Sequence, residues 1–363
     1  VPAATPAPAT KDSYNDELLA VLASPNVASK EWVIRQYDHE VQGTSAIKPL
    51  VGVGEDGPGD AAVVTPIYGS NKAVAISCGM NPTLGDLDPY QSALHAVDEA
   101  LRNLVSVGGD VETTAILDNF CWGNCNKPDR MGALVQAAKA CYEAAMTYGT
   151  PFVSGKDSLN NEFVTDTGET IAIPPTLLIS AFGLVDDASK CITSDAKAAG
   201  NKVYLVGTTR PELGGAHLLL ANGLDTGNDV PPVDCKTNFN TFVALGKAIR
   251  SGLARTCHDL SEGGLAAAAA EMAFSGGLGI ELSTDAMIVD GDASQTAKLF
   301  GESAGRFLVE VTPDNAAAFE AAMGEPACAA IGEITDTGRV QIDSAIDLAN
   351  TDTKAAWQGT FNW

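Results

Sequence analysis

Apolar residues follow two spacings along the first half of the chain. Helical spacing, in which they recur every three to four positions, predicts helices over 14–24, 30–42, 90–107 and 130–149. Short apolar runs bounded by glycine-rich turns predict strands over 61–69, 72–79, 111–120 and 174–185. We expect the first two strands to form a hairpin around Ser70 and Asn71. This mixture predicts an α+β domain.

The pattern changes after residue 186. The segment 186–201 carries only scattered apolar residues, and a new apolar strand begins at 202. Beyond it, the spacing predicts helices over 238–252, 262–274 and 314–323 and strands near 305–311 and 329–334. These elements predict an α/β domain. Because the start of the chain is rich in Pro and Ala, we expect a linker over 1–13, an α+β domain over 14–186 and an α/β domain over 187–363.

The charge of the chain argues against some kinds of binding partner, and its cysteine content indicates a cellular compartment. The 363 residues include 46 acidic and 22 basic side chains, a formal net charge of −24. A surface this acidic repels the phosphates of nucleic acids and of anionic lipids, so we expect neither kind of partner. No apolar stretch reaches the roughly 20 residues of a membrane span. Eight scattered cysteines predict reduced thiols and a cytoplasmic protein.

The loop GEDGPGD (54–60) precedes a predicted strand and suits a phosphate and a cation. Gly57 and Gly59 lack side chains, so backbone N–H groups can approach a phosphate. Asp60 can hold Mg²⁺ at the entrance to the strand. The alternative is a charged surface turn.

Two further segments carry oxygen atoms at suitable spacing. Glu99 and Asn103 stand four residues apart in a predicted helix and so share one face, either toward a cation or toward solvent. Asp259 and Ser261 precede an alanine-rich helix, and a helix N-terminus favours anions, although Ser261 could simply cap the helix. Together with Asp60, these segments predict Mg²⁺ bound to a nucleotide.

A fourth segment places a cation beside a glycine in this acidic chain. In FVSGKDS (152–158), Gly155, Lys156 and Ser158 follow an apolar strand, which suits a polyanion. The spacing is not that of a Walker A loop, and an ion-paired hairpin loop is the alternative. None of the four histidines is predicted to be a catalytic base, and we expect His95 and His258 to support neighbouring loops.

Eight segments, taken in order, resemble phosphoribosylformylglycinamidine synthase, the synthetase of de novo purine synthesis. They are ASKEWVIRQYDHEVQG, GDAAVV, DLDPY, DEALRNLVSVGG, ILDNFCWGN, SGKDSLNNE, CHDLSEGGLAAAAAE and FGESAGRFLVEV. The resemblance covers only the second of the two homologous halves of the synthetase region. The motif with the family's catalytic histidine belongs to the first half and is not found here. We therefore expect the isolated chain to be inactive.

The resemblance implies a fold, a reaction and site residues. The fold is aminoimidazole-ribotide-synthetase-like, with a ferredoxin-like α+β domain followed by an α/β domain. The reaction is an ATP-dependent amidation of formylglycinamide ribonucleotide with ammonia from glutamine. Family residues are matched as Mg²⁺ ligands by Asp60, Glu99, Asn103 and Asp259, as nucleotide contacts by Gly59, Ser261, Asp118 and Gly155, and as a substrate contact by Ser158. Lys156 replaces a metal-binding Asn of the family's small form, so we expect it to contact phosphate instead.

The resemblance also implies partners and leaves alternatives open. The expected partners are the N-terminal half of the same synthetase and a glutaminase subunit or domain. An isolated half can also pair with a second copy through its α+β domain. The nucleotide, ATP or ADP, is either consumed or structural, so one alternative is a scaffold with a bound Mg²⁺ nucleotide. The other is a different ATP-dependent enzyme of the same superfamily.

Overall fold

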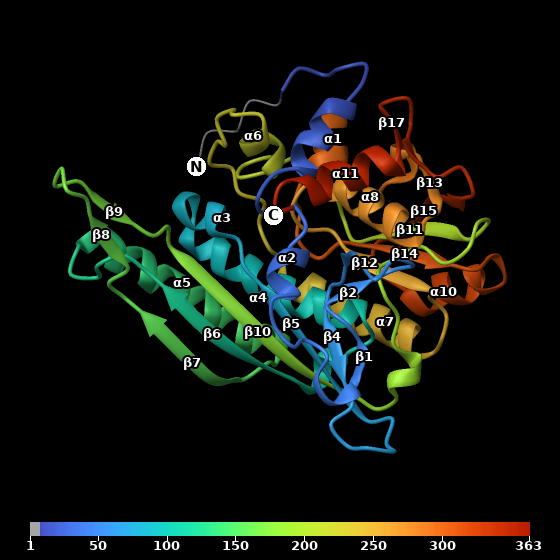
Figure 1. The fold of residues 1–363 in the computed structure, drawn as a ribbon, viewed down its shortest axis with the longest axis horizontal. Coiled ribbons are helices and arrows are strands. Elements are labelled where there is room, and N and C mark those ends of the chain that lie inside the picture. The colour runs from blue at the N-terminus through green and yellow to red at the C-terminus, as the bar shows by residue number, and fades with distance from the viewer. Residues whose placement is uncertain (1–7) are drawn as a thin grey trace.

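The chain folds around two β-sheets, one in each half (Figure 1). The computed structural model describes residues 8–363, so the first seven residues of the predicted linker lie outside the described part. Among the helices of residues 8–363, none combines the length and the hydropathy needed to cross a membrane.

The first sheet has six strands, and two long helices cover one of its faces. The strand order is β1 (Ser45–Ile47), β4 (Ala62–Val64), β5 (Ala73–Gly79), β10 (Thr176–Val185), β6 (Thr114–Cys121) and β7 (Phe152–Ser158). Neighbouring strands are antiparallel except β6 and β7, which are parallel because α5 (Pro128–Tyr148) connects them. The other covering helix, α4 (Pro89–Ser106), is buried along most of its length.

Helix α4 is buried on more than one side because it also contacts the second half, through α7 (Cys235–Arg250) and β12 (Thr256–Asp259). Short elements complete the first half. They are α3 (Pro82–Leu87), the pair β2 (Leu50–Val51) and β3 (Gly57–Pro58), and the hairpin β8 (Glu162–Val164) and β9 (Thr170–Ala172). The hairpin projects from the end of the sheet at which β7 ends (Figure 1).

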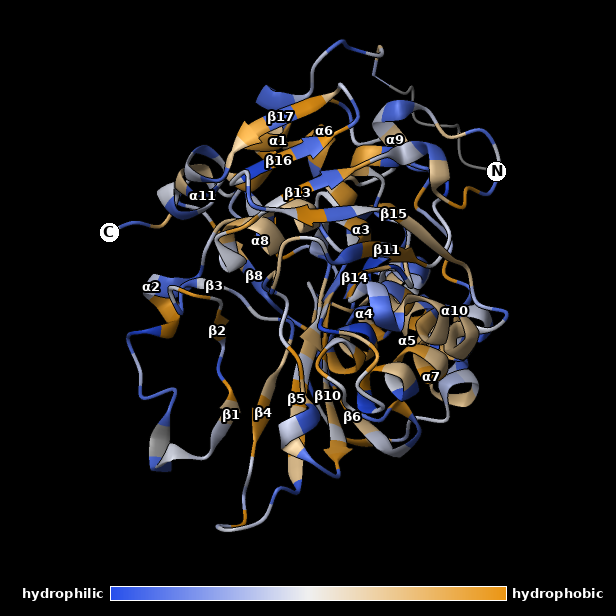
Figure 2. Cartoon of the chain, turned by 90° about the vertical axis from the view of Figure 1, so that its right-hand side faces the viewer, coloured by the Kyte–Doolittle hydropathy of each residue, from blue (hydrophilic) through white to orange (hydrophobic). Residues whose placement is uncertain are grey.

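The second sheet has seven strands, mostly antiparallel. The strand order is β12 (Thr256–Asp259), β14 (Phe307–Val311), β11 (Lys202–Val206), β15 (Cys328–Thr335), β13 (Gly279–Leu282), β16 (Arg339–Ile342) and β17 (Ile346–Ala349). Strands β13 and β16 form its parallel pair. Hydrophobic and hydrophilic residues alternate along β16 and β17, as expected for strands with one buried face (Figure 2).

Helices of the second half pack around this sheet. They are α6 (His217–Ala221), α7 (Cys235–Arg250), α8 (Gly264–Gly276), α9 (Gln295–Phe300), α10 (Ala316–Met323) and α11 (Asn350–Gly359). Helix α8 is buried at nearly every position, which is why its sequence is almost entirely alanine and other apolar residues.

The start of the chain packs against the second half. Helix α1 (Asn15–Leu22) contacts α11, α6 and α8. Its apolar residues Leu18, Val21 and Leu22 join the core that contains α8. The sequence groups this helix with the α+β domain over 14–186, whereas in the structure it covers the later domain.

Most predicted elements of the first half are present. The helices over 90–107 and 130–149 correspond to α4 and α5, and α5 ends at Gly149, which has the left-handed φ of 68°. The predicted hairpin is the antiparallel pair β4 and β5. Strand β4 ends at Val64 rather than at 69, two residues before Pro66, which lacks the N–H that a strand pair requires.

The predicted helix over 30–42 is wrong. Helix α2 spans only Glu31–Ile34, and the chain then turns before a single 3₁₀ turn at Val41–Gly43. Its apolar residues Trp32 and Val33 are 41% and 51% exposed. The helix therefore lacks the buried face that would stabilise a longer one, since short helices depend on tertiary packing.

Candidate functional site

A cavity of about 230 Å³ lies where the two halves meet. Its lining includes the loop before β4, the middle of α4, the end of β12 and the loop that leads from it into α8, and the side of α8. Six of the residues predicted from the sequence line it together, namely Gly59, Asp60, Glu99, Asn103, Asp259 and Ser261. The structure thus brings together side chains that are separated by up to about 200 residues of sequence.

The loop that carries Asp259 and Ser261 depends on two glycines. Gly263 and Gly264 both have positive φ, 83° and 61°, a conformation that other residues rarely adopt. A Cβ on Gly264 would lie 2.5 Å from the carbonyl oxygen of Gly301. Strand β12 can therefore turn directly into α8 only because these positions lack side chains.

Asp60 has one satisfied and one unsatisfied oxygen. Its Oδ1 accepts a hydrogen bond from Nδ1 of His258 at 2.6 Å. Its Oδ2 is buried and has no hydrogen-bond partner among residues 8–363. Burial raises the pKa of Asp60, and His258 opposes that rise. A cation beside Oδ2 would give this buried oxygen a partner.

Glu99 and Asn103 lie on the same face of α4, as their spacing predicts. The Nδ2 of Asn103 donates to the carbonyl oxygen of Cys78 at 3.0 Å, but its Oδ1 is buried without a partner in the described chain. The backbone N–H of Met80 donates to Glu99 at 2.8 Å. Burial and the nearby Glu262 hold the pKa of Glu99 well above its usual value. A bound cation would favour the charged carboxylate.

Arg102 connects Asp259 to the rest of the site. Its Nε donates to Asp259 Oδ2 at 3.1 Å, its Nη2 donates to Ser261 Oγ at 2.9 Å, and its Nη1 pairs with Asp98. Ser261 also donates to Asp259 Oδ2. Since the bonds to Asp259 from Arg102 Nε and from Ser261 both end on Oδ2, Oδ1 is the oxygen of Asp259 that remains for a ligand.

The cavity is strongly negative. Among residues 8–363, five acidic side chains and a single basic one, His258, line it. The acidic residues are Asp60, Glu99, Asp259, Glu262 and Glu271. Ligand atoms of Asp60, His258 and Asp259 all lie within 4.8 Å of one another. Both ring nitrogens of His258 contact carboxylates, so the carboxylate and amide oxygens are the groups suited to a hard cation.

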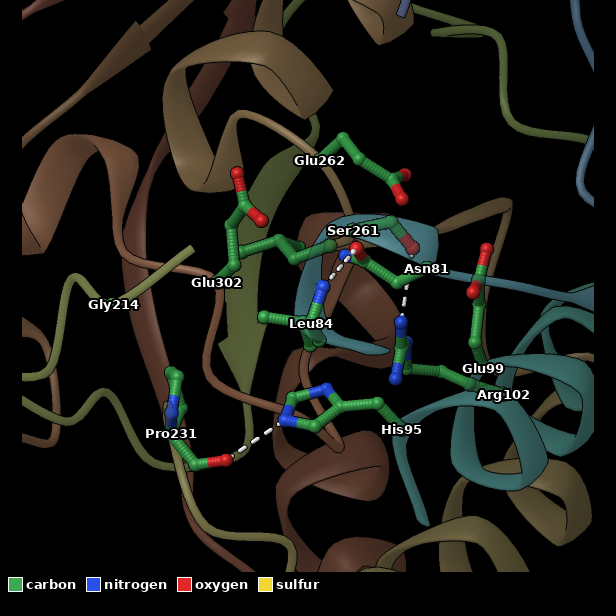
Figure 3. Close-up of a pocket in the computed structure, with 11 residues that line it drawn as sticks. Asn81, Leu84, His95, Glu99, Arg102, Gly214, Pro231, Ser261, Glu262 and Glu302 are labelled. Atoms are coloured by element: carbon green, nitrogen blue, oxygen red, sulfur yellow. Dashed lines mark hydrogen bonds between the residues drawn. The ribbon is translucent and has the colours of Figure 1, made fainter. Parts of the chain in front are cut away.

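A narrower cavity adjoins the first and shares Glu99, Ser261 and Glu262 with it. Figure 3 shows His95, Glu99 and Arg102 on α4, below the loop that carries Ser261 and Glu262. Glu302 binds the backbone N–H groups of His217 and Gly263 at 2.7 and 2.9 Å. Glu302 therefore fixes the start of α8, and with it the loop above the site.

The remaining predicted residues form a second group on β6 and β7. Asp118 faces Gly155 across the parallel pair, and a Cβ on Gly155 would lie 2.4 Å from Asp118 Oδ1. Lys156 is exposed and contacts the hydroxyl of Ser158. None of these four residues lines the Asp60 cavity. Gly155, Lys156 and Ser158 lie on β7, the edge strand of the sheet, and Asp118 lies on the neighbouring β6, so another chain segment could complete a site at this edge.

Sequence reasoning missed the roles of Arg102 and His258. His95 supports a neighbouring loop as expected, because its ring binds the carbonyl oxygen of Pro231 at 2.8 Å. His258 also supports a neighbouring loop, the one before β4, but it does so by contacting Asp60, one of the predicted Mg²⁺ ligands, and the sequence does not indicate that contact. Only the four-residue spacing of Asp98 and Arg102 hinted that Arg102 is paired within the helix.

Two family profiles match the chain. Residues 58–185 match the N-terminal domain of AIR synthase related proteins, and residues 198–344 match the C-terminal domain. Together they cover more than half of the chain. The chain therefore belongs to the AIR synthase related proteins, and its fold is the two-domain aminoimidazole-ribotide-synthetase-like fold that the motifs predicted.

Within that family, the chain is similar to the PurL subunit of phosphoribosylformylglycinamidine synthase. It is 36% identical to the Anaeromyxobacter dehalogenans subunit over 366 residues, an alignment that covers 97% of this chain and 46% of the relative. The chain thus spans about half the length of that relative. The resemblance found from the eight segments is confirmed.

Solved structures of PurL from T. maritima share the fold. The structure titled as a complex with FGAR matches with a TM-score of 0.72 and 18% identity, covering 93% of this chain and 52% of that one. The structure titled as a complex with ATP matches with a TM-score of 0.67 and 18% identity, covering 94% and 52%. Identities this low establish the fold alone.

Proposed function

We propose that this chain is the second half of a phosphoribosylformylglycinamidine synthase synthetase region and binds a magnesium nucleotide in the Asp60 cavity. The observation that carries the proposal is a pair of buried oxygens, Asp60 Oδ2 and Asn103 Oδ1, that have no hydrogen-bond partner within residues 8–363 and lie in a cavity lined by carboxylates. Unsatisfied buried acceptors are rare and demand a partner. Oxygen ligands of this kind suit Mg²⁺.

Four residues would hold the cation, namely Asp60, Glu99, Asn103 and Asp259. Gly59 and Ser261 would contact the nucleotide, either ATP or ADP. The carboxylates would repel a triphosphate that arrived alone, so the nucleotide must enter with its cation. When bound, Mg²⁺ offsets the charge on phosphate oxygens and so stabilises phosphoryl transfer.

The proposed reaction converts formylglycinamide ribonucleotide, ammonia and ATP to formylglycinamidine ribonucleotide, ADP and phosphate. The relatives named as PurL and the T. maritima complexes titled with FGAR and ATP support it. On β6 and β7, Asp118, Gly155 and Lys156 would contact ATP, and Ser158 would contact the substrate. Because this group lies at the β7 edge of the first sheet, the first half of the synthetase would complete its site.

The proposed partners follow from the need for the first half of the synthetase to complete the site. They are the N-terminal half of the synthetase and a glutaminase subunit or domain that supplies ammonia. A T. maritima structure titled PurLQS supports an assembly of this kind. In isolation the chain would be inactive and could pair with a second copy through its first sheet. All eight cysteines are free, which suits the cytoplasm.

A second candidate is a scaffold in which the magnesium nucleotide only stabilises the fold. The separation of the Asp60 cavity from the group on β6 and β7 favours it, because a nucleotide in that cavity would not contact Asp118. Both candidates require a magnesium nucleotide in the Asp60 cavity. They differ in whether this chain also takes part in the amidation, which the first candidate assigns to the group on β6 and β7.

Calorimetry followed by a turnover assay tests both candidates. We expect the chain to bind ATP or ADP only with Mg²⁺, and Asp60→Asn to weaken binding at least tenfold. Glu281→Gln, an exposed carboxylate on β13, is the control and should leave binding unchanged. Adding the N-terminal half should restore amidation, and Asp118→Ala should abolish it. Bound nucleotide without hydrolysis, together with full activity of Asp118→Ala, would favour the scaffold.

A further inference from the structure

His258 on β12 connects two carboxylates that come from different segments. Its Nδ1 donates to Asp60 Oδ1 at 2.6 Å, and its Nε2 donates to Glu271 Oε2 at 3.0 Å. The side chains of Asp60, His258 and Glu271 are only 3%, 6% and 14% exposed. Ionised carboxylates only accept hydrogen bonds, so the ring donates at both nitrogens.

Glu271 fixes the orientation of this ring. An imidazole ring can turn about its Cβ–Cγ bond, which replaces each nitrogen by a ring carbon. A ring that is hydrogen-bonded at both nitrogens loses both bonds in that turn, so a single orientation is favoured. Glu271 lies on α8, the helix that follows the loop with Asp259 and Ser261. The ring thereby couples the position of α8 to the position of Asp60, which lies in the loop before β4.

We propose that Glu271 is a positioning residue that acts through His258 and holds the Asp60 carboxylate with Oδ2 directed to a divalent cation. The inference rests on the magnesium site proposed above. In the described chain no donor competes for Oδ2, so the bond from His258 to Oδ1 decides how this oxygen is presented. Partners that orient a metal ligand commonly change metal affinity 10–100-fold when removed.

Three variants of the full chain test the role of Glu271. Glu271→Met keeps most of the side-chain volume but cannot accept the bond from His258. Glu271→Ala also removes the acceptor and leaves a smaller side chain. Glu271→Gln keeps an acceptor without the charge. The control is Glu310→Gln on β14, a buried carboxylate that binds the backbone N–H groups of Lys197 and Ala198 away from the cavity.

The measurements are the affinity for Mn²⁺ with ADP and crystal structures without ligand. We expect Glu271→Met to lose the contact between Asp60 and His258 and to bind Mn²⁺ with ADP 10–100-fold more weakly. Glu271→Gln should keep the contact and stay within about threefold of the wild type. Glu310→Gln should lower thermal stability without changing affinity. If Glu271→Met does not fold, Glu271→Ala takes its place with the same expectation.

Two results would overturn the positioning role. One is an unchanged contact between Asp60 and His258 in a variant without the acceptor. The other is equal loss of affinity in Glu271→Gln and Glu271→Met, which would make Glu271 a direct ligand. A wild-type chain that binds no Mn²⁺ with ADP would instead refute the proposed nucleotide site, while the ligand-free structures would still decide whether Glu271 holds Asp60.

Discussion

Buried acceptors are nearly always satisfied in folded proteins, because leaving one unpaired costs about 1–3 kcal/mol. Asp60 Oδ2 and Asn103 Oδ1 are unpaired among residues 8–363 and line the same cavity. Glu99 adds a buried carboxylate whose pKa is raised well above its usual value by burial and by Glu262. Such unfavourable groups are expected where a ligand, rather than the fold, requires them.

Glu99→Gln should raise the stability of the ligand-free chain and lower its affinity for Mg²⁺ with ADP. Glutamine keeps the acceptor for the N–H of Met80 but removes a charge that burial disfavours. We expect the ligand-free variant to be more stable than the wild type by about 1 kcal/mol at pH 8. At this pH the glutamate is ionised in the unfolded chain, so folding must either bury its charge or bind a proton, and both lower the free energy of unfolding. Its affinity for Mg²⁺ with ADP should fall at least tenfold. Urea unfolding and calorimetry measure the two effects, and a destabilised ligand-free variant would contradict the expectation.

His217 should make the fold less stable at high pH. Burial alone would lower the pKa of His217, but the carboxylate of Glu302, 3.2 Å from Nδ1, raises it to about 9. Because the unfolded histidine has a pKa near 6.5, the stabilisation is complete below about pH 6.5 and is lost as the pH rises through 9. The full effect is about 3 kcal/mol.

Unfolding free energies at pH 6 and pH 9.5 check this expectation. The decrease between these values should be smaller in His217→Gln than in the wild type, because other groups that titrate in this range are common to both proteins. An equal decrease in the two proteins would show that His217 is not the responsible group.

At the scale of elements, the turn between β12 and α8 positions half of the site. Gly264→Ala should destabilise the fold by about 2–3 kcal/mol, because it adds a positive φ penalty and a clash with the carbonyl oxygen of Gly301. The matched control is Gly277→Ala at the other end of α8, where φ is also positive but the space is open, and about 1 kcal/mol is expected. Equal costs in urea unfolding would contradict this account of the turn.

Local patterns predicted some elements and not others, for physical reasons. Helix α4 carries a long apolar face, and the spacing of Glu99 and Asn103 placed both on one side of it. The helix predicted over 30–42 is only the short α2 in the structure, because apolar spacing does not reveal whether another part of the protein packs against that face. The bonds from Arg102 to Asp259 and from His258 to Asp60 join residues 157 and 198 positions apart, so no local pattern contains them.

At the scale of the whole molecule, Asp98 joins the two halves. This fully buried carboxylate accepts from Tyr148 on α5 at 2.8 Å, from Asn238 on α7 at 2.6 Å and from the N–H of Gly305 at 3.0 Å, and it pairs with Arg102. The four donors come from both domains. Asp98 therefore connects the domain interface to the residue that holds Asp259.

Asp98→Ala should be among the most damaging single changes. Removing one partner of a buried ion pair typically costs about 3–5 kcal/mol, because the other charge stays buried. Tyr148→Phe removes only one of the four donors and should cost about 1 kcal/mol. Denaturant unfolding compares the two variants, and similar small costs would show that Asp98 does not hold the domains together.

The central claim is that Asp60, Glu99, Asn103 and Asp259 converge on one divalent cation that carries a nucleotide. Crystals of the chain grown with Mn²⁺ and ADP test it most directly, since Mn²⁺ gives an anomalous signal. We predict a peak within direct coordination distance of Asp60 Oδ2, with the phosphates beside Gly59 and Ser261. A nucleotide bound elsewhere, or a Mn²⁺ ion that touches none of these four residues, would contradict the account.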